Sequence, residues 1–216
     1  MPQRKSAFER DFRLAAEKFP KLKYELDKQR KLWVITGELD ICDRVGVYWG
    51  TFDIRIFVPQ NYPHCVPKVQ ELSTLIPRDV DWHIDEDGTC CVDINHKMTH
   101  MARIGINLSD FITQKVYSFF ANQLFKMSKG AYAGEEYEHH FAGVVQFYQE
   151  DLGLNQKQAI PMLEAILGGA IGRNGKCPCG SVQKLKHCHL ISFSFLKSME
   201  RDQLRRDLRS FKALSA

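Results

Sequence analysis

Residues 52–59 have the sequence FDIRIFVP, and this segment decides the fold class. Its apolar residues alternate with Asp53 and Arg55, and a period of two is typical of a β-strand with one buried face. Two neighbouring segments, 32–41 and 66–72, are also rich in strand-forming residues. Strands that follow one another so closely predict an antiparallel meander.

Helical patterns lie on both sides of this meander. Residues 4–19 carry apolar side chains near helical spacing, and residues 108–124 do the same after a long loop at 73–93. Further helices are expected at 135–152, 160–167 and 194–214. Strands grouped before helices indicate an α+β fold, with helices on one face of an antiparallel sheet. Loops as long as 73–93 are often functional.

The composition is that of an ordinary globular protein. The 216 residues are 44% hydrophobic and 26% charged, which excludes wholesale disorder and a fibrous repeat. The net charge of +4 is too mild to argue for nucleic acid as a partner. The first ten residues lack the apolar core of a secretory signal, and the longest apolar stretches are too short to span a bilayer. We therefore expect a cytoplasmic protein without membrane contact.

Seven cysteines need an explanation, because an odd number in a reducing compartment does not form a disulfide framework. Three of them lie near the C-terminus, where one residue separates Cys177 from Cys179 and eight residues separate Cys179 from Cys188. Cys188 and His189 complete a set of four donors that suits a tetrahedral zinc site. His187 is the alternative histidine ligand. A metal-free loop is the other interpretation, although three unbridged thiols on so polar a loop would oxidise readily.

This segment resembles the SEC-C motif, a short zinc-binding module at the ends of many bacterial proteins and of the SecA translocase. The resemblance rests on Gly172-Arg173-Asn174 and on Cys177-Pro178-Cys179-Gly180-Ser181. It implies that the metal ligands are Cys177, Cys179, Cys188 and His189. Four protein ligands leave no open position, so the zinc is expected to be structural.

The meander carries a second resemblance. Val58-Pro59 is followed by Tyr62-Pro63, then by His83, and residues 87–94 read DGTCCVDI. This pattern resembles the catalytic core of ubiquitin-conjugating enzymes, the E2 enzymes, over about residues 4–152. The family's fold has an N-terminal helix, a four-stranded antiparallel meander and C-terminal helices. The motif match implies that Cys91 is the nucleophile, while Cys90 takes an apolar position; the alternative is a match shifted by one residue, which would exchange the two cysteines.

The chain departs from the family just before this cysteine. Most members carry His-Pro-Asn, whose Asn is credited with stabilising an oxyanion, whereas this chain has His83-Ile84-Asp85. His83 could donate a hydrogen bond or accept a proton from the incoming nucleophile, or it could be a structural loop residue. An ionised Asp85 is an acceptor only. Candidate auxiliary residues are Asp85, Cys90 and Asn95, and a surface role is the alternative for Asn95.

Bacterial relatives in antiphage operons, such as the cyclic-oligonucleotide systems (CBASS), tend to lack that Asn and to continue with a segment like Gly143-Val144-Val145-Gln146-Phe147-Tyr148. This resemblance implies an acyltransferase. Cys91 would accept the C-terminus of a cGAS-like nucleotidyltransferase as a thioester and pass it to an amine. A separate activating enzyme could supply the donor.

The expected organisation has four parts: a catalytic domain at 1–153, a helical connection at 154–171, the zinc motif at 172–190 and a basic C-terminal helix at 191–216. The alternative function is an inactive E2-like binding or adaptor module that carries a zinc knuckle. A third interpretation, an adaptor for nucleic acid, is weakened by the mild charge. Because inactive members of the fold usually lack the cysteine, its presence favours the enzyme.

Overall fold

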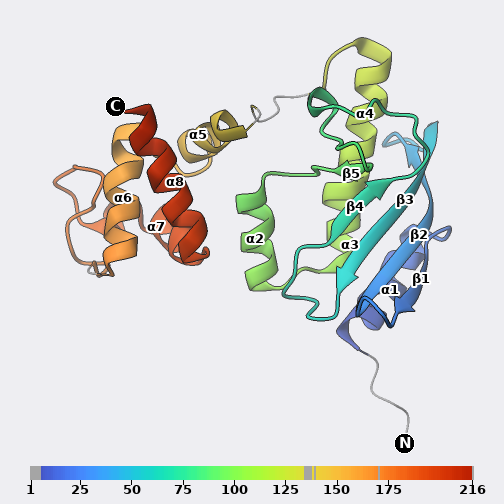
Figure 1. The fold of residues 1–216 in the computed structure, drawn as a ribbon, viewed down its shortest axis with the longest axis horizontal. Helices are drawn as coiled ribbons and strands as arrows, with labels where there is room; N and C mark the ends of the chain where they lie inside the picture. Colours follow the sequence, from blue (N-terminus) through green and yellow to red (C-terminus); the bar gives the residue numbers. More distant parts are fainter. Residues whose placement is uncertain (1–5, 134–137, 139, 170, 216) are drawn as a thin grey trace, which may run out of the picture. The chain divides into compact units, whose positions relative to one another are not determined.

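The computed structural model describes residues 6–133, 138, 140–169 and 171–215 (Figure 1). The chain divides into two compact units, Met1–Glu135 and Glu136–Ala216. Among the described residues, no helix has the length and apolar character needed to cross a membrane.

The first unit is built on a five-stranded antiparallel sheet with the strand order β1-β2-β3-β4-β5 (Figure 1). The predicted α+β class agrees with this architecture, although the sheet has one strand more than the four expected. The additional strand is very short and lies inside the predicted long loop, where no periodic pattern marks it. The strands are β1 (Lys23–Asp27), β2 (Leu32–Cys42), β3 (Tyr48–Pro59), β4 (Lys68–Glu71) and β5 (Thr89–Cys90).

Strand β3 shows the alternation that its sequence predicts. Ile54, Ile56 and Val58 are fully buried, whereas Asp53 is exposed and Arg55 is half-buried on the opposite face. Within the described part of the first unit, the helices pack on the buried face. Helix α1 (Ala7–Lys18) stacks its Phe8 ring on Trp33 of β2, and Phe120 from a later helix packs against Phe52 of β3. One face of the sheet therefore lies in the core of the first unit.

The later helices of the first unit flank the long loop. Helix α2 (Asn95–Ile104) follows it directly. An almost continuous helical segment comes next, formed by α3 (Leu108–Phe111), a π-helical segment η2 (Ile112–Tyr117) and α4 (Ser118–Lys129). The sequence predicts this segment but not α2, and it gives no signal for the π-helical turn.

The second unit is helical. Its elements are α5 (His140–Glu150), α6 (Gln156–Gly168), a short 3₁₀ turn η3 (Leu185–His187), α7 (Leu190–Lys197) and α8 (Arg201–Leu214). The Tyr148 hydroxyl of α5 donates a hydrogen bond of 2.9 Å to Asp207 of α8, and both side chains are buried. The terminal helix predicted from the sequence is therefore two helices, and its Asp207 faces the interior.

Helix α5 belongs to this second unit, because its Tyr148 and Phe141 rings pack against Phe211 of α8. The compact units thus divide before α5, whereas the sequence assigns residues up to 153 to the catalytic domain. The four-part domain organisation stays a prediction.

Candidate functional site

A tight hairpin presents the two adjacent cysteines. The Asp85 amide donates to the Thr89 carbonyl at 2.9 Å, and Ile84 forms a bridge with Cys90. Gly88 lies at the turn with a φ of +82°, and a Cβ atom there would come within 2.6 Å of the Glu71 carbonyl oxygen. A glycine at position 88 is therefore required by the close approach of β4, and the hairpin places Cys91 directly after β5.

The two cysteines meet different environments. Cys90 is buried against β4, and burial raises the pKa of its thiol to about 12. The side chain of Cys91 is exposed. Of this pair, only Cys91 offers an accessible sulfur, while Cys90 packs as a small apolar residue.

Residues around Cys91 fix its backbone with a hydrogen bond and make the thiolate form of its side chain less stable. Its amide donates to the His83 carbonyl at 2.8 Å, and its Sγ lies 3.7 Å from the Asp93 carbonyl oxygen. Partial burial raises the pKa of the Cys91 thiol, and the carboxylates of Asp93 and Asp85 raise it further. At neutral pH the resting site therefore holds a thiol beside two negative charges.

A lysine fixes one of these carboxylates. Lys115 Nζ lies 2.5 Å from Asp93 Oδ2, and both side chains are largely buried. The other oxygen, Asp93 Oδ1, accepts the Ile94 amide at 2.7 Å. Lys115 lies in the π-helical segment η2, and such π turns occur frequently at functional sites. The sequence did not reveal Lys115, because no local pattern joins residue 115 to residue 93.

His83 is held in an unusual backbone conformation. It ends the 3₁₀ turn η1 (Val80–Trp82) with a φ of +52°, which residues other than glycine seldom adopt. Its ring lies against Tyr132, with centroids 5.9 Å apart. The structure therefore joins His83 to Cys91 through the His83 carbonyl.

Side chains from α4 hold the loop that carries His83. Gln123, which is fully buried, donates from Nε2 to the Trp82 carbonyl at 3.1 Å. Lys126 donates to the Asp81 carbonyl, and its Nζ lies 4.7 Å from the Trp82 ring centroid and 4.1 Å from that of Tyr132. Two consecutive carbonyls of the loop are thus bound by one helix.

The remaining predicted auxiliary residues differ in position. Asp85 lies in the hairpin with an exposed side chain, close enough to Cys91 to raise the pKa of its thiol. Asn95 is the first residue of α2 and is exposed, and no hydrogen bond joins it to Cys91 within the described part of the chain. The structure brings His83, Asp85 and Cys91 together and leaves Asn95 outside.

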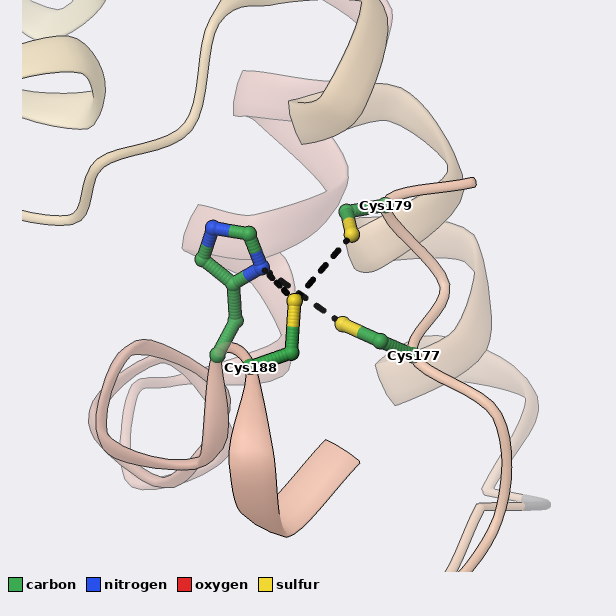
Figure 2. A group of neighbouring side chains, drawn as sticks. Cys177, Cys179 and Cys188 are labelled. Atoms are coloured by element: carbon green, nitrogen blue, oxygen red, sulfur yellow. Dashed lines mark hydrogen bonds between the residues drawn. The ribbon is translucent and has the colours of Figure 1, made fainter. Parts of the chain in front are cut away.

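The second unit contains a compact cluster of metal-binding groups (Figure 2). One donor atom from each of Cys177, Cys179, Cys188 and His189 lies within 4.8 Å of all the others. Cys179 and Cys188 have their sulfurs 3.6 Å apart, and His189 Nδ1 lies 3.5 Å from Cys177 Sγ and 3.1 Å from Cys188 Sγ. Zinc–sulfur bonds of about 2.3 Å at tetrahedral angles need sulfurs about 3.8 Å apart. The cluster therefore has the spacing to hold a metal ion such as zinc.

The surroundings of the cluster also suit a metal. His189 Nδ1 faces the sulfurs, while Nε2 lies 3.3 Å from the Gly153 carbonyl oxygen, the second contact that metal-binding histidines commonly make. The backbone around it is a small hairpin, in which the Cys177 amide donates to the Gln183 carbonyl at 2.9 Å. His187, the alternative ligand, is exposed and does not belong to the cluster.

Comparisons with known proteins give two partial similarities, and no protein-family model matches the chain. Ubiquitin-conjugating enzyme E2 N of Macaca fascicularis is 33% identical over 85 residues, which cover 38% of this chain and 51% of that enzyme. This similarity supports an E2-like relationship. Protein translocase subunit SecA of Bartonella henselae is 46% identical over 41 residues, or 19% of this chain and 4% of SecA. The matched part spans about half of the E2 enzyme and a small fraction of SecA.

Proposed function

We propose that the chain is an E2-like cysteine acyltransferase that carries a protein C-terminus as a thioester on Cys91. The observation that carries the proposal is the exposed Cys91 at the end of β5, whose amide donates to the His83 carbonyl and whose Sγ lies 3.7 Å from the Asp93 carbonyl oxygen. The partial similarity to a ubiquitin-conjugating enzyme supports the same class of reaction.

The proposed reaction has two steps. In the first, the Cys91 thiol gives its proton to a base, and the resulting thiolate attacks the carbonyl carbon of a C-terminus that an activating enzyme presents as a thioester. The new C–S bond forms, and the thiolate of the activating enzyme leaves. In the second, an amine attacks the Cys91 thioester, the C–S bond breaks, and the amine proton passes to a base while Cys91 leaves as a thiolate.

The charges around Cys91 suit the second step best. Asp85 and Asp93 disfavour a resting thiolate but attract an ammonium group, the form in which a lysine arrives. We assign Asp85 and His83 as candidates to accept the amine proton, because the Asp85 carboxylate acts on the Cys91 thiol and the His83 carbonyl accepts the Cys91 amide. Asn95 is not assigned a role.

The donor in this proposal is a cGAS-like nucleotidyltransferase of an antiphage operon, which follows from the resemblance of the chain to such bacterial enzymes. The metal in this proposal is a structural zinc ion held by Cys177, Cys179, Cys188 and His189. Four protein ligands leave it without an open position for substrate.

Replacement of Cys91 tests the proposal. Cys91→Ser or Cys91→Lys, purified from cells that carry the neighbouring genes, is expected to retain the donor as an ester or an amide that mass spectrometry locates at residue 91. Cys91→Ala is expected to retain nothing, and Cys90→Ala is the matched control that still forms the conjugate. If Cys91→Ala supports conjugation at the wild-type rate, the assignment of Cys91 as the nucleophile is wrong.

A further inference from the structure

The connection between β2 and β3 exposes four large apolar side chains at one end of the sheet (Figure 1). Residues 43–49 have the sequence DRVGVYW, and Val45, Val47, Tyr48 and Trp49 are 85%, 56%, 60% and 46% exposed. Single exposed apolar residues are ordinary, whereas a group of four within five positions indicates a contact surface. We call residues 43–49 the apolar turn.

Asp43 fixes the backbone of the apolar turn. Its Oδ1 accepts the amide of Val45 at 2.9 Å and that of Val47 at 2.8 Å. The Asp43 amide donates to the Val47 carbonyl at 2.9 Å, and the Asp43 carbonyl accepts the Gly46 amide at 3.1 Å. The two valines are therefore held outward before any partner arrives, which lowers the entropy lost on binding.

The first unit anchors both ends of the apolar turn. At one end, the Tyr117 hydroxyl accepts the Cys42 amide at 2.7 Å and donates to the Cys42 carbonyl at 2.6 Å. At the other end, Gly50 lies so close to α4 that a Cβ atom there would come within 3.2 Å of Leu124. The exposed side chains thus stand on a fixed base.

The apolar turn presents a positive charge. Arg44 is exposed and has no carboxylate within ion-pair distance among the residues that the structure describes. The carboxylate of Asp43 is used by the two amides of the turn. Farther along β2, Glu38 and Asp40 both pair with Lys21. An anionic partner would therefore meet Arg44 without a competing acidic group in the turn.

The order of the side chains suits a lipid interface. Val45 and Val47 flank Gly46 at the tip, and Tyr48 and Trp49 follow at the start of β3. Aliphatic side chains are favoured among acyl chains, whereas tryptophan and tyrosine are enriched at the level of the headgroups. Cationic side chains are attracted to anionic lipids. All three kinds of residue occur here in one short turn.

We propose that the apolar turn is an interfacial contact site for a bilayer surface that carries anionic lipids. Val45 and Val47 would enter the outer edge of the acyl chains, while Arg44 meets the headgroups. The sequence argues against membrane contact only because it lacks a segment long enough to span a bilayer, and an interfacial site does not need one. The proposal goes beyond the acyl transfer at Cys91 and does not depend on it.

Co-sedimentation with lipid vesicles tests the proposal. We expect the wild-type protein to bind vesicles of phosphatidylcholine and phosphatidylglycerol, and to bind pure phosphatidylcholine less. Binding should weaken as salt rises. The double variant Val45→Glu/Val47→Glu should bind at least about tenfold more weakly. Arg44→Glu should lose the preference for anionic vesicles, and Arg44→Lys should retain it.

Tryptophan fluorescence locates the contact within the chain. Anionic vesicles should shift the emission of the wild type to shorter wavelength, and brominated phosphatidylcholine in the vesicles should quench it. Trp49→Phe should still bind but lose most of both effects, because the remaining tryptophans, Trp33 and Trp82, are only partly exposed and lie outside the apolar turn.

The matched control is Val80→Glu, the same substitution at a valine that is also exposed. Cys91→Ala is expected to bind vesicles as the wild type does, so failure of membrane contact and failure of acyl transfer can be told apart. The proposal would be overturned if the wild type does not bind anionic vesicles, or if Val45→Glu/Val47→Glu and Arg44→Glu bind them unchanged. A wild type that is dimeric without lipid, with a monomeric Val45→Glu/Val47→Glu variant, would instead assign the turn to a second copy of the chain.

Discussion

At the scale of single residues, a strand explains why two adjacent cysteines have different chemistry. Consecutive side chains of a strand point to opposite faces, so Cys90 enters the core and Cys91 reaches solvent. Burial raises the pKa of Cys90 to about 12, which keeps that thiol protonated at neutral pH. The proposed role of Cys91 therefore rests on its accessibility rather than on any activation of its sulfur.

The carboxylate of Asp85 can be removed without disturbing a buried contact. Because this charge raises the pKa of the Cys91 thiol, Asp85→Asn should lower it and increase the thiolate fraction at neutral pH. We expect alkylation of Cys91 by iodoacetamide to become about twofold faster or more at pH 7, with its pH profile displaced to lower pH. Peptide mass spectrometry follows the modification at residue 91.

Glu86→Gln is the matched control, since Glu86 is equally exposed in the same hairpin but does not shift the pKa of Cys91. An unchanged pH profile in Asp85→Asn would show that the charge of Asp85 does not reach the sulfur.

The sequence predicts the four metal-binding residues but not the ion pair beside Cys91. The spacing in Cys177-Pro178-Cys179 and Cys188-His189 requires only local geometry, and the four donors do converge. The ion pair between Lys115 and Asp93 joins distant parts of the chain through a π-helical turn, which apolar periodicity does not reveal. Local spacing can therefore predict a metal centre, whereas the electrostatics of the thiol site require the folded chain.

At the scale of elements, α4 determines the conformation of the loop before the hairpin. Lys126 binds the Asp81 carbonyl and lies against two aromatic rings, while Gln123 binds the Trp82 carbonyl. These contacts hold His83 in its left-handed backbone conformation, with its carbonyl on the Cys91 amide. Helix α4 thus holds the loop although neither Lys126 nor Gln123 has a contact with the Cys91 sulfur among those of the described residues.

Lys126→Met should loosen this loop. We expect hydrogen exchange at the Cys91 amide to become about tenfold faster, because local opening releases the His83 carbonyl. Lys126→Arg preserves both the hydrogen bond and the cation–π contacts and should stay close to the wild type. Lys129→Met, on an exposed side of the same helix, should have no effect. If the Cys91 amide exchanges at the same rate in Lys126→Met and in the wild type, Lys126 of α4 does not hold the loop.

Metal binding by the second unit can be tested by replacing one ligand of the cluster. Cys177→Ser removes one thiolate of the cluster, and we expect zinc content to fall from about one equivalent to near zero, together with a lower melting temperature of the second unit. Wild-type protein treated with a chelator should behave in the same way. Cys42→Ser, which lies outside the cluster, is the control. A wild-type protein purified without any bound metal would contradict the assignment.

Some elements could not be predicted, for physical reasons. Helix α2 has few apolar residues, and only Met98 and Ala102 among them are buried, so its pattern is weak. Packing in the first unit stabilises it instead. The terminal helix has continuous helical periodicity, yet it divides at Ser198–Glu200, where Met199 turns into the core. Strand β3 and helix α1 were predictable because one face of each is uniformly apolar.

At the scale of the whole molecule, the division into two units predicts local effects of mutations. Tyr148→Phe removes the hydroxyl that donates to the buried Asp207 and should destabilise the second unit by about 1–3 kcal/mol. Hydrogen exchange should increase in α5–α8, while the strands of the first unit keep their protection. Faster exchange in β3 would show that the two units are coupled.

The same pair gives a pH dependence with a definite sign. Burial and the charge of Asp207 raise the pKa of Tyr148 above that of an exposed tyrosine, so the folded state holds the proton more tightly. Its contribution to stability is complete below about pH 10 and is lost as the pH rises further. Denaturant unfolding of the wild type above pH 10 should show this loss, and Tyr148→Phe should remove the Tyr148 contribution to it.

The contact between His189 and the Gly153 carbonyl has a consequence for protein engineering. Residues 172–190 contain all four metal donors, so they look like a cassette that could be moved into another protein. However, the second nitrogen of His189 depends on a carbonyl 36 positions earlier in the chain. A cassette of residues 172–190 alone would lack the Gly153 carbonyl. No contact from Gly153 would then fix the tautomer of His189. The smallest portable version of the motif therefore begins before Gly153, with the end of α5.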